Sequence, residues 1–289
     1  MHKSGTTLAL HAGEYQAQIV TVGAGLASLT HRGRHVVIPH PPEAMPLAHL
    51  GKVLIPWPNR IANGSYQHEG VTLTPAINDR AGNAAIHGLL AWQNWQIVEQ
   101  STSHVKLSAF LPPTYGYPFM LAAEVTYRLD EQTGLSARIG SKNIGDATAP
   151  YGAGVHPYLT CNLQSVDGCE LRLPASKIFD VATSRYYTDK TLDFQQTRII
   201  GTICIDNTFN VLQHDAPWEV RLVHPQTAMS VWLRSEQPWI QIYSGEKLQR
   251  RGLAVEPMSC PPDAFNSGID RLWLAPGDTH VLRFDIGSE

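Results

Sequence analysis

Glu256 lies within residues 252–266, where a strand-like apolar run is followed by prolines at positions 257, 261 and 262. Proline fixes φ and has no backbone donor, so we expect the strand to end at Glu256 and a stiff loop to follow. A carboxylate whose direction is fixed by a rigid backbone is suited to general acid–base chemistry. The alternative is a stiff surface loop that carries an incidental acid.

Four further segments present polar side chains next to turn-forming residues. They are 55–64 with Asn59 and Arg60, 85–89 with His87, 151–159 with His156, and 203–209 with Asp206. Taken singly, each has an ordinary structural explanation: a histidine in a turn or core, an aspartate that initiates a turn, an arginine in a surface ion pair. Two imidazoles, two carboxylates and one guanidinium on constrained loops of one chain together indicate an acid–base site.

The elements that must position these side chains are predicted to be strands. Short alternating apolar and polar runs recur between clusters of Gly, Pro, Asn and Asp, in a chain with 23 Gly and 20 Pro. This spacing is typical of a β-sandwich. The runs are 16–22, 95–99, 105–110, 121–129, 135–139, 220–224, 230–234, 240–244 and 280–286. No linker divides them, so we predict one all-β domain over residues 1–289, a large antiparallel β-sandwich.

The composition excludes several functional classes. A net charge of −3 gives no basic footprint for nucleic acid. No run is long enough to cross a bilayer, and the amino terminus lacks the apolar core of a signal peptide, so we expect a cytoplasmic protein without a membrane partner. The four cysteines have no Cys-x-x-Cys spacing, which argues against a zinc knuckle or a disulfide framework. We expect a monomer or a homodimer.

With these segments in view, the chain resembles the aldose 1-epimerase (galactose mutarotase-like) family. The matching elements are residues 23–26, 58–64, 87–88, 156–158, 206 and 255–257. They follow the order of the family from about residue 8 to the carboxyl end. The Asn-Arg-Ile-Ala-Asn-Gly run at 59–64 is the most specific of them. The fold that the resemblance implies, a β-supersandwich, agrees with the strand pattern.

The resemblance implies interconversion of the α and β anomers of an aldose through its open-chain aldehyde. Glu256 would be the general base that takes the C1 hydroxyl proton, and His156 the general acid that protonates the ring oxygen. Near neutral pH this requires Glu256 to be ionised and His156 to be protonated, a state that a nearby carboxylate favours. Arg60, His87 and Asp206 would bind the sugar. A small-molecule sugar is the only partner implied, and no metal, nucleotide or redox cofactor is required.

Other side chains extend the predicted substrate site. Asn59 precedes Arg60, and the aromatic rings of Trp57 and Tyr158 are candidates for an apolar sugar face, although both are equally suited to the core. Further aromatic candidates are Tyr115, Tyr117, Trp239 and Phe265. Segment 256–266 is most similar to a bacterial subgroup of the family, some members of which act on sulfoquinovose, a glucose with an anionic C6 group. Such a substrate needs a cation, for which the candidates are Lys52, Arg80 and Lys247.

Two alternatives belong to other functional classes. In the first, His87, His156, Asp206 and Glu256 are ligands of a metal in a β-sandwich enzyme. In the second, the domain is a non-catalytic carbohydrate-binding or sugar-sensing protein on the same fold. Loss of the acid or the base would indicate the second class, and both positions are filled here.

Overall fold

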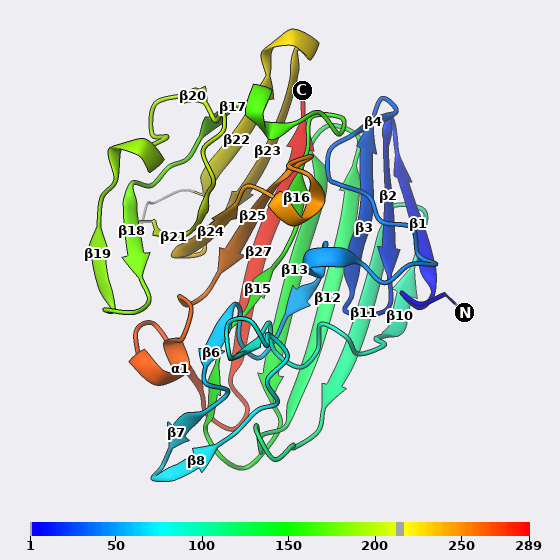
Figure 1. Ribbon diagram of the computed structural model, residues 1–289. Coiled ribbons are helices and arrows are strands. Elements are labelled where there is room, and N and C mark those ends of the chain that lie inside the picture. Colours follow the sequence, from blue (N-terminus) through cyan, green and yellow to red (C-terminus); the bar gives the residue numbers. More distant parts are fainter. Residues whose placement is uncertain (1, 212–216) are drawn as a thin grey trace.

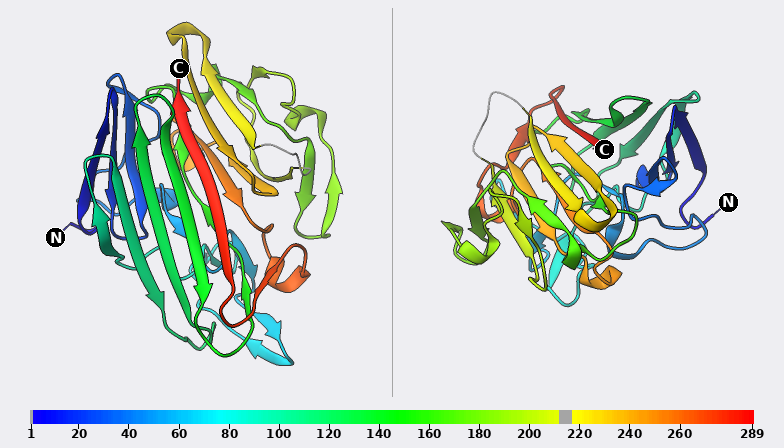
Figure 2. Two further views of the ribbon diagram at one scale, coloured as in Figure 1. Left: turned by 180° about the vertical axis from the view of Figure 1, so that it is seen from behind. Right: turned by 90° about the horizontal axis from the view of Figure 1, so that it is seen from above.

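The structure is a computed structural model that describes residues 2–211 and 217–289. Two layers of antiparallel sheet face one another (Figures 1 and 2). The first layer is a nine-stranded sheet, which is nearest the viewer in the left view of Figure 2. Its strands are, in order, β10 (Gln96–Gln100), β11 (His104–Leu111), β12 (Leu121–Asp130), β13 (Gly134–Asn143), β27 (Thr279–Ser288), β23 (Met229–Ser235), β22 (Trp218–His224), β17 (Glu170–Arg172) and β20 (Arg198–Ile199).

The second layer contains an eight-stranded and a four-stranded sheet. The eight-stranded sheet runs β19 (Arg185–Tyr187), β18 (Lys177–Asp180), β21 (Asp206–Asn210), β24 (Trp239–Tyr243), β25 (Leu253–Met258), β15 (Gly154–Val155), β5 (Val53–Leu54), with β16 (Tyr158–Leu159) also paired to β25. The four-stranded sheet runs β1 (Thr7–Ala12), β2 (Tyr15–Val20), β3 (Gly25–His31), β4 (Arg34–His35). This arrangement confirms the predicted antiparallel all-β sandwich.

Short elements complete the fold. The two-stranded sheets are β14 (Ala149–Tyr151) with β26 (Leu272–Leu274), β6 (Arg60–Ala62) with β9 (Ala84–Ile86), and β7 (Tyr66–His68) with β8 (Val71–Leu73). The helical turns are η1 (Leu47–His49), η2 (Val166–Gly168), η3 (Lys190–Leu192), η4 (Pro225–Thr227), η5 (Glu246–Leu248) and α1 (Ala264–Ser267). Within the described residues, no helix has the length and apolarity needed to span a membrane.

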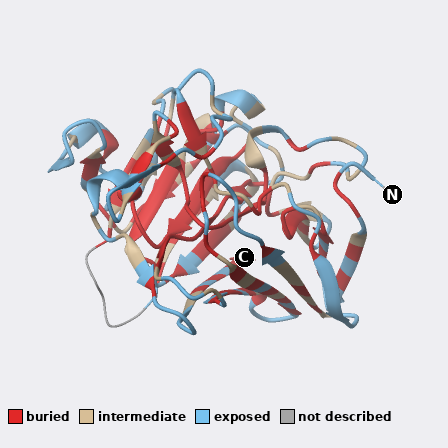
Figure 3. Cartoon of the chain, turned by 90° about the horizontal axis from the view of Figure 1, so that it is seen from below, coloured by how far each residue is buried: buried red, intermediate tan, exposed pale blue. Residues whose placement is uncertain are grey.

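The alternating sequence pattern becomes alternating burial. In β12, the side chains of Leu121, Ala123, Val125, Tyr127 and Leu129 are buried, while the residues between them face outward. Successive side chains of a strand point to opposite faces, so each such strand adds one apolar row to the space between the layers. Figure 3 shows buried residues concentrated in the strands and exposed residues in the peripheral loops.

The strand that carries Glu256 does not end where the prolines predicted. β25 continues through Pro257 to Met258 inside the eight-stranded sheet, with Pro257 opposite Ile240 of β24. On its other side, β25 pairs with β16 at Ala254 and with β15 at Met258, and the ladder has no partner opposite Pro257. The missing proline donor therefore falls in a gap of the ladder, which explains how an interior strand accommodates it.

Candidate active site

A cavity of about 290 Å³ is lined by residues of the eight-stranded sheet and of neighbouring loops, and it gathers most of the predicted site. The sequence-predicted residues that line it are Asn59, Arg60, His87, His156, Tyr158, Asp206 and Glu256. They come from segments far apart in sequence. Arg60 begins β6 and Asp206 begins β21, while Glu256 lies within β25 and His156 lies in the connection between β15 and β16. The fold therefore brings these side chains together in one wall.

His156 and Glu256 are in direct contact. Nε2 of His156 lies 3.3 Å from Oε1 of Glu256, and the two residues are only 6% and 2% exposed. His156 occupies the connection between β15 and β16, directly beside β25, and its ring stacks on Tyr158 at a centroid distance of 5.0 Å. The general acid and general base inferred from the sequence thus form one buried pair that reaches the cavity.

Burial governs the protonation of this pair. It lowers the pKa of His156 to about 3, with the charge of His49 adding to the effect. Burial, followed by the charge of Asp206, raises the pKa of Glu256 well above its usual range, and the charge of Arg60 opposes this rise. The pair therefore favours one shared proton and no net charge, which differs from the expected carboxylate and imidazolium. The reason is that desolvation penalises both charged forms.

His87 is positioned by backbone geometry. Its φ is 64°, and its N–H donates to the carbonyl of Asn59, whose φ is 51°. A Cβ at the next residue, Gly88, would approach the carbonyl oxygen of Ile55 to 2.2 Å, so only glycine permits this turn. The ring of His87 is then held edge-on to His156 at a centroid distance of 5.1 Å. The His-Gly pair in the sequence is thereby explained.

Arg60 and Asp206 are each held by a partner that the sequence did not reveal. Nε of Arg60 donates to Oδ2 of Asp79 at 2.9 Å. Oδ1 of Asp206 accepts from Nε2 of Gln241 at 2.7 Å. Gln241 lies on β24 directly opposite Glu256 of β25, which places the amide between the two carboxylates. These contacts fix the directions of a guanidinium and a carboxylate at the cavity wall.

Further lining residues escaped sequence reasoning. They are Ala48, His49, Asn78, Asp79, Ile86, Gln241 and Tyr243. Gln241 and Tyr243 carried a usable signal, since both lie in the predicted strand 240–244 and share one face by its alternation. Ile86 ends the short strand β9, and the others are in turns and loops, whose paths are set by tertiary contacts.

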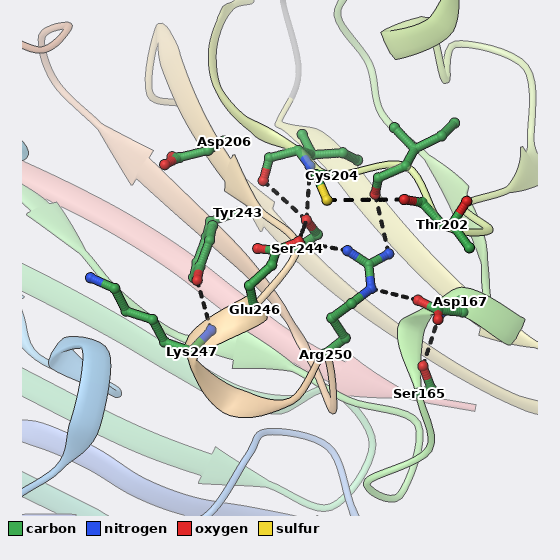
Figure 4. Close-up of polar contacts among 12 residues, drawn as sticks. Ser165, Asp167, Thr202, Cys204, Asp206, Tyr243, Ser244, Glu246, Lys247 and Arg250 are labelled. Atoms are coloured by element: carbon green, nitrogen blue, oxygen red, sulfur yellow. Dashed lines mark hydrogen bonds and ion pairs between the residues drawn. The ribbon is translucent and has the colours of Figure 1, made fainter.

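Lys247 is presented by the turn η5. Figure 4 shows Arg250 bridging Asp167 and Glu246 beside this turn, while the side chain of Lys247 extends away from the network. The backbone N–H of Lys247 donates to the hydroxyl of Tyr243 at 2.8 Å. These contacts therefore hold the backbone of η5 in place. The ammonium group of Lys247 points away from Arg250 and its partners.

Trp57 is placed in the core and does not line the cavity. It is 2% exposed, its indole donates to the carbonyl of Ala85, and its ring packs against Phe265 at 5.8 Å. Of the other aromatic candidates, only Tyr158 lines the cavity. Trp57 was a candidate both for the sugar face and for the core, and the flanking prolines of this loop do not determine toward which side its ring turns.

The cationic candidates also separate. Lys247 lines the cavity, whereas Arg80 is exposed outside it. Lys52 is fully buried, with its ammonium group donating to the carbonyl of Val22 and lying 5.1 Å from the ring of Trp92. Regarding the alternative metal set, the described residues contain no group of three or more His, Cys, Asp or Glu side chains arranged to hold a metal ion.

Solved structures identify the fold class. The chain resembles the GalM/aldose epimerase homologue from C. elegans with a TM-score of 0.87 and 18% identity, over 98% of each chain. It resembles galactose 1-epimerase from Lactobacillus acidophilus NCFM with a TM-score of 0.81 and 17% identity, over 96% of this chain and 92% of that one. At such identities the likeness establishes the fold, which is that of the galactose mutarotase-like proteins.

The sequence itself establishes the family. The aldose 1-epimerase family model matches residues 6–287, so the chain belongs to the aldose 1-epimerase family and to the carbohydrate epimerase class of enzymes. It is 58% identical over 292 residues to YihR of Escherichia coli (strain K12), an uncharacterized protein, covering 99% of this chain and 94% of that relative.

Proposed function

We propose that the protein is a cofactor-independent mutarotase that interconverts the α and β anomers of an aldohexose, or of a C6-modified aldohexose such as sulfoquinovose. The observation that carries this proposal is the buried contact of 3.3 Å between His156 and Glu256 in the cavity wall. Ring opening requires one group to take a proton from O1 and another to give a proton to O5. Two titratable groups that share one proton meet both requirements.

The proton count closes over the reaction. Glu256 takes the proton of the C1 hydroxyl while His156 gives its proton to O5, and the C1–O5 bond breaks as C1=O1 forms. The pair holds one proton before and after this step. Rotation about C1–C2 presents the other face of the aldehyde, and the reverse transfers close the ring. Each positioned acid or base contributes about 10²–10⁴ in rate.

Substrate binding prepares the pair for these roles. A C1 hydroxyl that donates to Glu256 stabilises the carboxylate form, and the charge of Arg60 acts in the same direction on the pKa of Glu256. The shared proton then resides on His156, where the acid role requires it. Asp206 accepts hydrogen bonds from other sugar hydroxyls. His87 also hydrogen-bonds a sugar hydroxyl, for which its neutral ring has one donor and one acceptor.

Lys247 is the residue we propose for an anionic C6 group. Among the three cationic candidates from the sequence, it is the one that lines the cavity. Its charge acts on the pKa of His49, His87 and Asp79, which supports a position near these groups. An ammonium group at the cavity mouth would attract a sulfonate or carboxylate without excluding a neutral hydroxymethyl group.

The first experiment uses freshly dissolved pure anomers and exchange NMR. Glucose, galactose and 6-deoxy-6-sulfo-glucose are followed with and without the protein. Accelerated exchange of any of them supports the mutarotase proposal. Saturable sugar binding with no acceleration would instead support a non-catalytic sugar-binding protein.

The second experiment tests the C6 assignment. Lys247→Gln should lower kcat/KM for the sulfonated sugar roughly tenfold or more and leave the neutral sugars within about twofold, since loss of a charged hydrogen bond costs about 1.5–3 kcal/mol. Lys142→Gln, on the exposed face of β13, is the matched control. Equal effects of Lys247→Gln on neutral and sulfonated sugars would reject the assignment.

A further inference from the structure

One cavity residue has no role in the scheme above. His49 lies in the turn η1, and its ring is 4.5 Å from that of His87, 6.2 Å from that of His156 and 5.5 Å from that of Trp92. It is half-buried and lines the cavity. Within the described chain, its ring nitrogens have no hydrogen-bond partner and are not among the buried unpartnered atoms, so they are not fully buried. A third imidazole therefore borders the cavity.

The backbone holds this imidazole in a costly conformation. Ala48 and His49 have φ of 49° and 53°, so two consecutive residues other than glycine occupy the left-handed region. Such residues cost about 1 kcal/mol or more each and persist where surrounding contacts enforce them. The carbonyl of His49 accepts a hydrogen bond from the backbone N–H of Lys52 at 3.0 Å. The carbonyl of Ala48 accepts one from the hydroxyl of Tyr158 at 3.2 Å.

The residues that follow this turn are hydrogen-bonded to His156, the proposed general acid. The N–H of Gly51 donates to the carbonyl of His156 at 2.9 Å, and the N–H of His156 donates to the carbonyl of Lys52 at 3.0 Å. This reciprocal pair joins η1 to the segment that carries His156. Main-chain hydrogen bonds therefore hold the backbone that follows His49 against the segment that carries His156.

We propose that His49 is a substrate-binding residue, which hydrogen-bonds one hydroxyl of the sugar and so selects the sugar by the position of that hydroxyl. This inference rests on the proposed function. Burial lowers the pKa of His49 to about 4, with the charges of Lys52 and Lys247 adding to this and that of Asp79 opposing it. At neutral pH the ring thus offers one donor and one acceptor, which matches a hydroxyl and not an anion.

The test pairs removal of the imidazole with removal of each hydroxyl. An aldose that the protein accepts and its 2-, 3-, 4- and 6-deoxy derivatives are measured with the parent, His49→Leu and His49→Asn. His49→Leu should raise KM for the full sugar roughly three- to tenfold with little change in kcat, as expected for one hydrogen bond. For one deoxy sugar this penalty should disappear. His49→Asn, which tolerates the left-handed backbone, should restore part of the loss.

Other outcomes reject the inference. An unchanged KM, or an equal penalty on every deoxy sugar, would assign His49 a structural role or none. His11→Ala, an exposed histidine on β1, is the control for a histidine change, and thermal unfolding confirms that each variant is folded. If the parent accelerates no anomer exchange, the proposed function fails. Binding of the same sugars, measured by saturation-transfer NMR, then tests whether His49 binds the sugar. Equal binding by parent and His49→Leu would overturn its role.

Discussion

Nε2 of His156 and Oε1 of Glu256 lie 3.3 Å apart although the residues are 100 positions apart in the chain. Both are buried, and β25 and the connection between β15 and β16 hold them side by side. A pair in contact acts as a unit, because the proton that one member receives is lost by the other. Replacing His156, Glu256 or both should therefore have non-additive effects on kcat.

Glu256→Gln and His156→Ala are each expected to lower kcat for anomer exchange by about 10²–10⁴, since each removes one of two coupled proton-transfer groups. The double variant should be no more than severalfold slower than the slower single variant. Polarimetry of freshly dissolved anomers measures this, and thermal unfolding checks the fold. Near-parental exchange by either single variant would contradict the assigned roles.

Gln241 is expected to orient Asp206. Gln241→Leu removes the donor to Oδ1 of Asp206 and leaves the buried hydroxyl of Thr208 without its acceptor. KM should rise roughly three- to tenfold, and the free energy of unfolding should fall by about 1–3 kcal/mol. Asp206→Asn in the same background checks the coupling, since it should add little to the KM of Gln241→Leu. Full additivity would show that the two side chains act independently.

Trp57 is expected to matter for stability and not for sugar binding. Trp57→Ala should lower the free energy of unfolding by about 3–5 kcal/mol, because a large buried ring is removed from the core. Trp57→Phe keeps most of the packing but loses the indole donor to Ala85, so its effect should be smaller. Denaturant unfolding measures both. A raised KM for a well-folded Trp57→Phe would place the ring at the sugar after all.

Because His40 is buried as a neutral imidazole, we expect the protein to lose stability in mild acid. It is 5% exposed, and burial lowers its pKa to about 4, with the carbonyl of Pro41 opposing this and the charge of Lys52 adding to it. The unfolded state, with an ordinary pKa near 6.5, binds the proton first as pH falls. The neutral residue therefore contributes stability above pH 6.5 that is lost progressively toward pH 4, about 1 kcal/mol of it between pH 7 and 5.5.

The variant His40→Gln isolates this contribution. Between pH 7 and 5.5 its free energy of unfolding should decrease by about 1 kcal/mol less than that of the parent, since the other buried histidines remain in both proteins. Calorimetry at the two pH values gives the comparison. Parallel decreases in the parent and the variant would exclude His40 as the source.

Local patterns in the sequence were sufficient for the architecture. The alternation in 121–129 and in 240–244 appears as β12 and β24, since successive side chains of a strand point to opposite faces with a local period of two. Residue types near turns also pointed to Arg60, His87, His156, Asp206 and Glu256, because acid–base chemistry needs ionisable groups on a constrained backbone. Their spacing in the sequence did not indicate how far apart these side chains lie in the folded protein.

The tertiary structure decided which side chains meet and how they ionise. It turned Trp57 into the core and brought His49, Asp79, Gln241 and Lys247 to the cavity, since loop paths depend on contacts with distant strands. It also favours the neutral forms of His156 and Glu256 over the charged forms expected from the sequence. A pKa reflects desolvation by the whole surrounding fold, and a linear sequence of residues does not state how deeply any of them is buried.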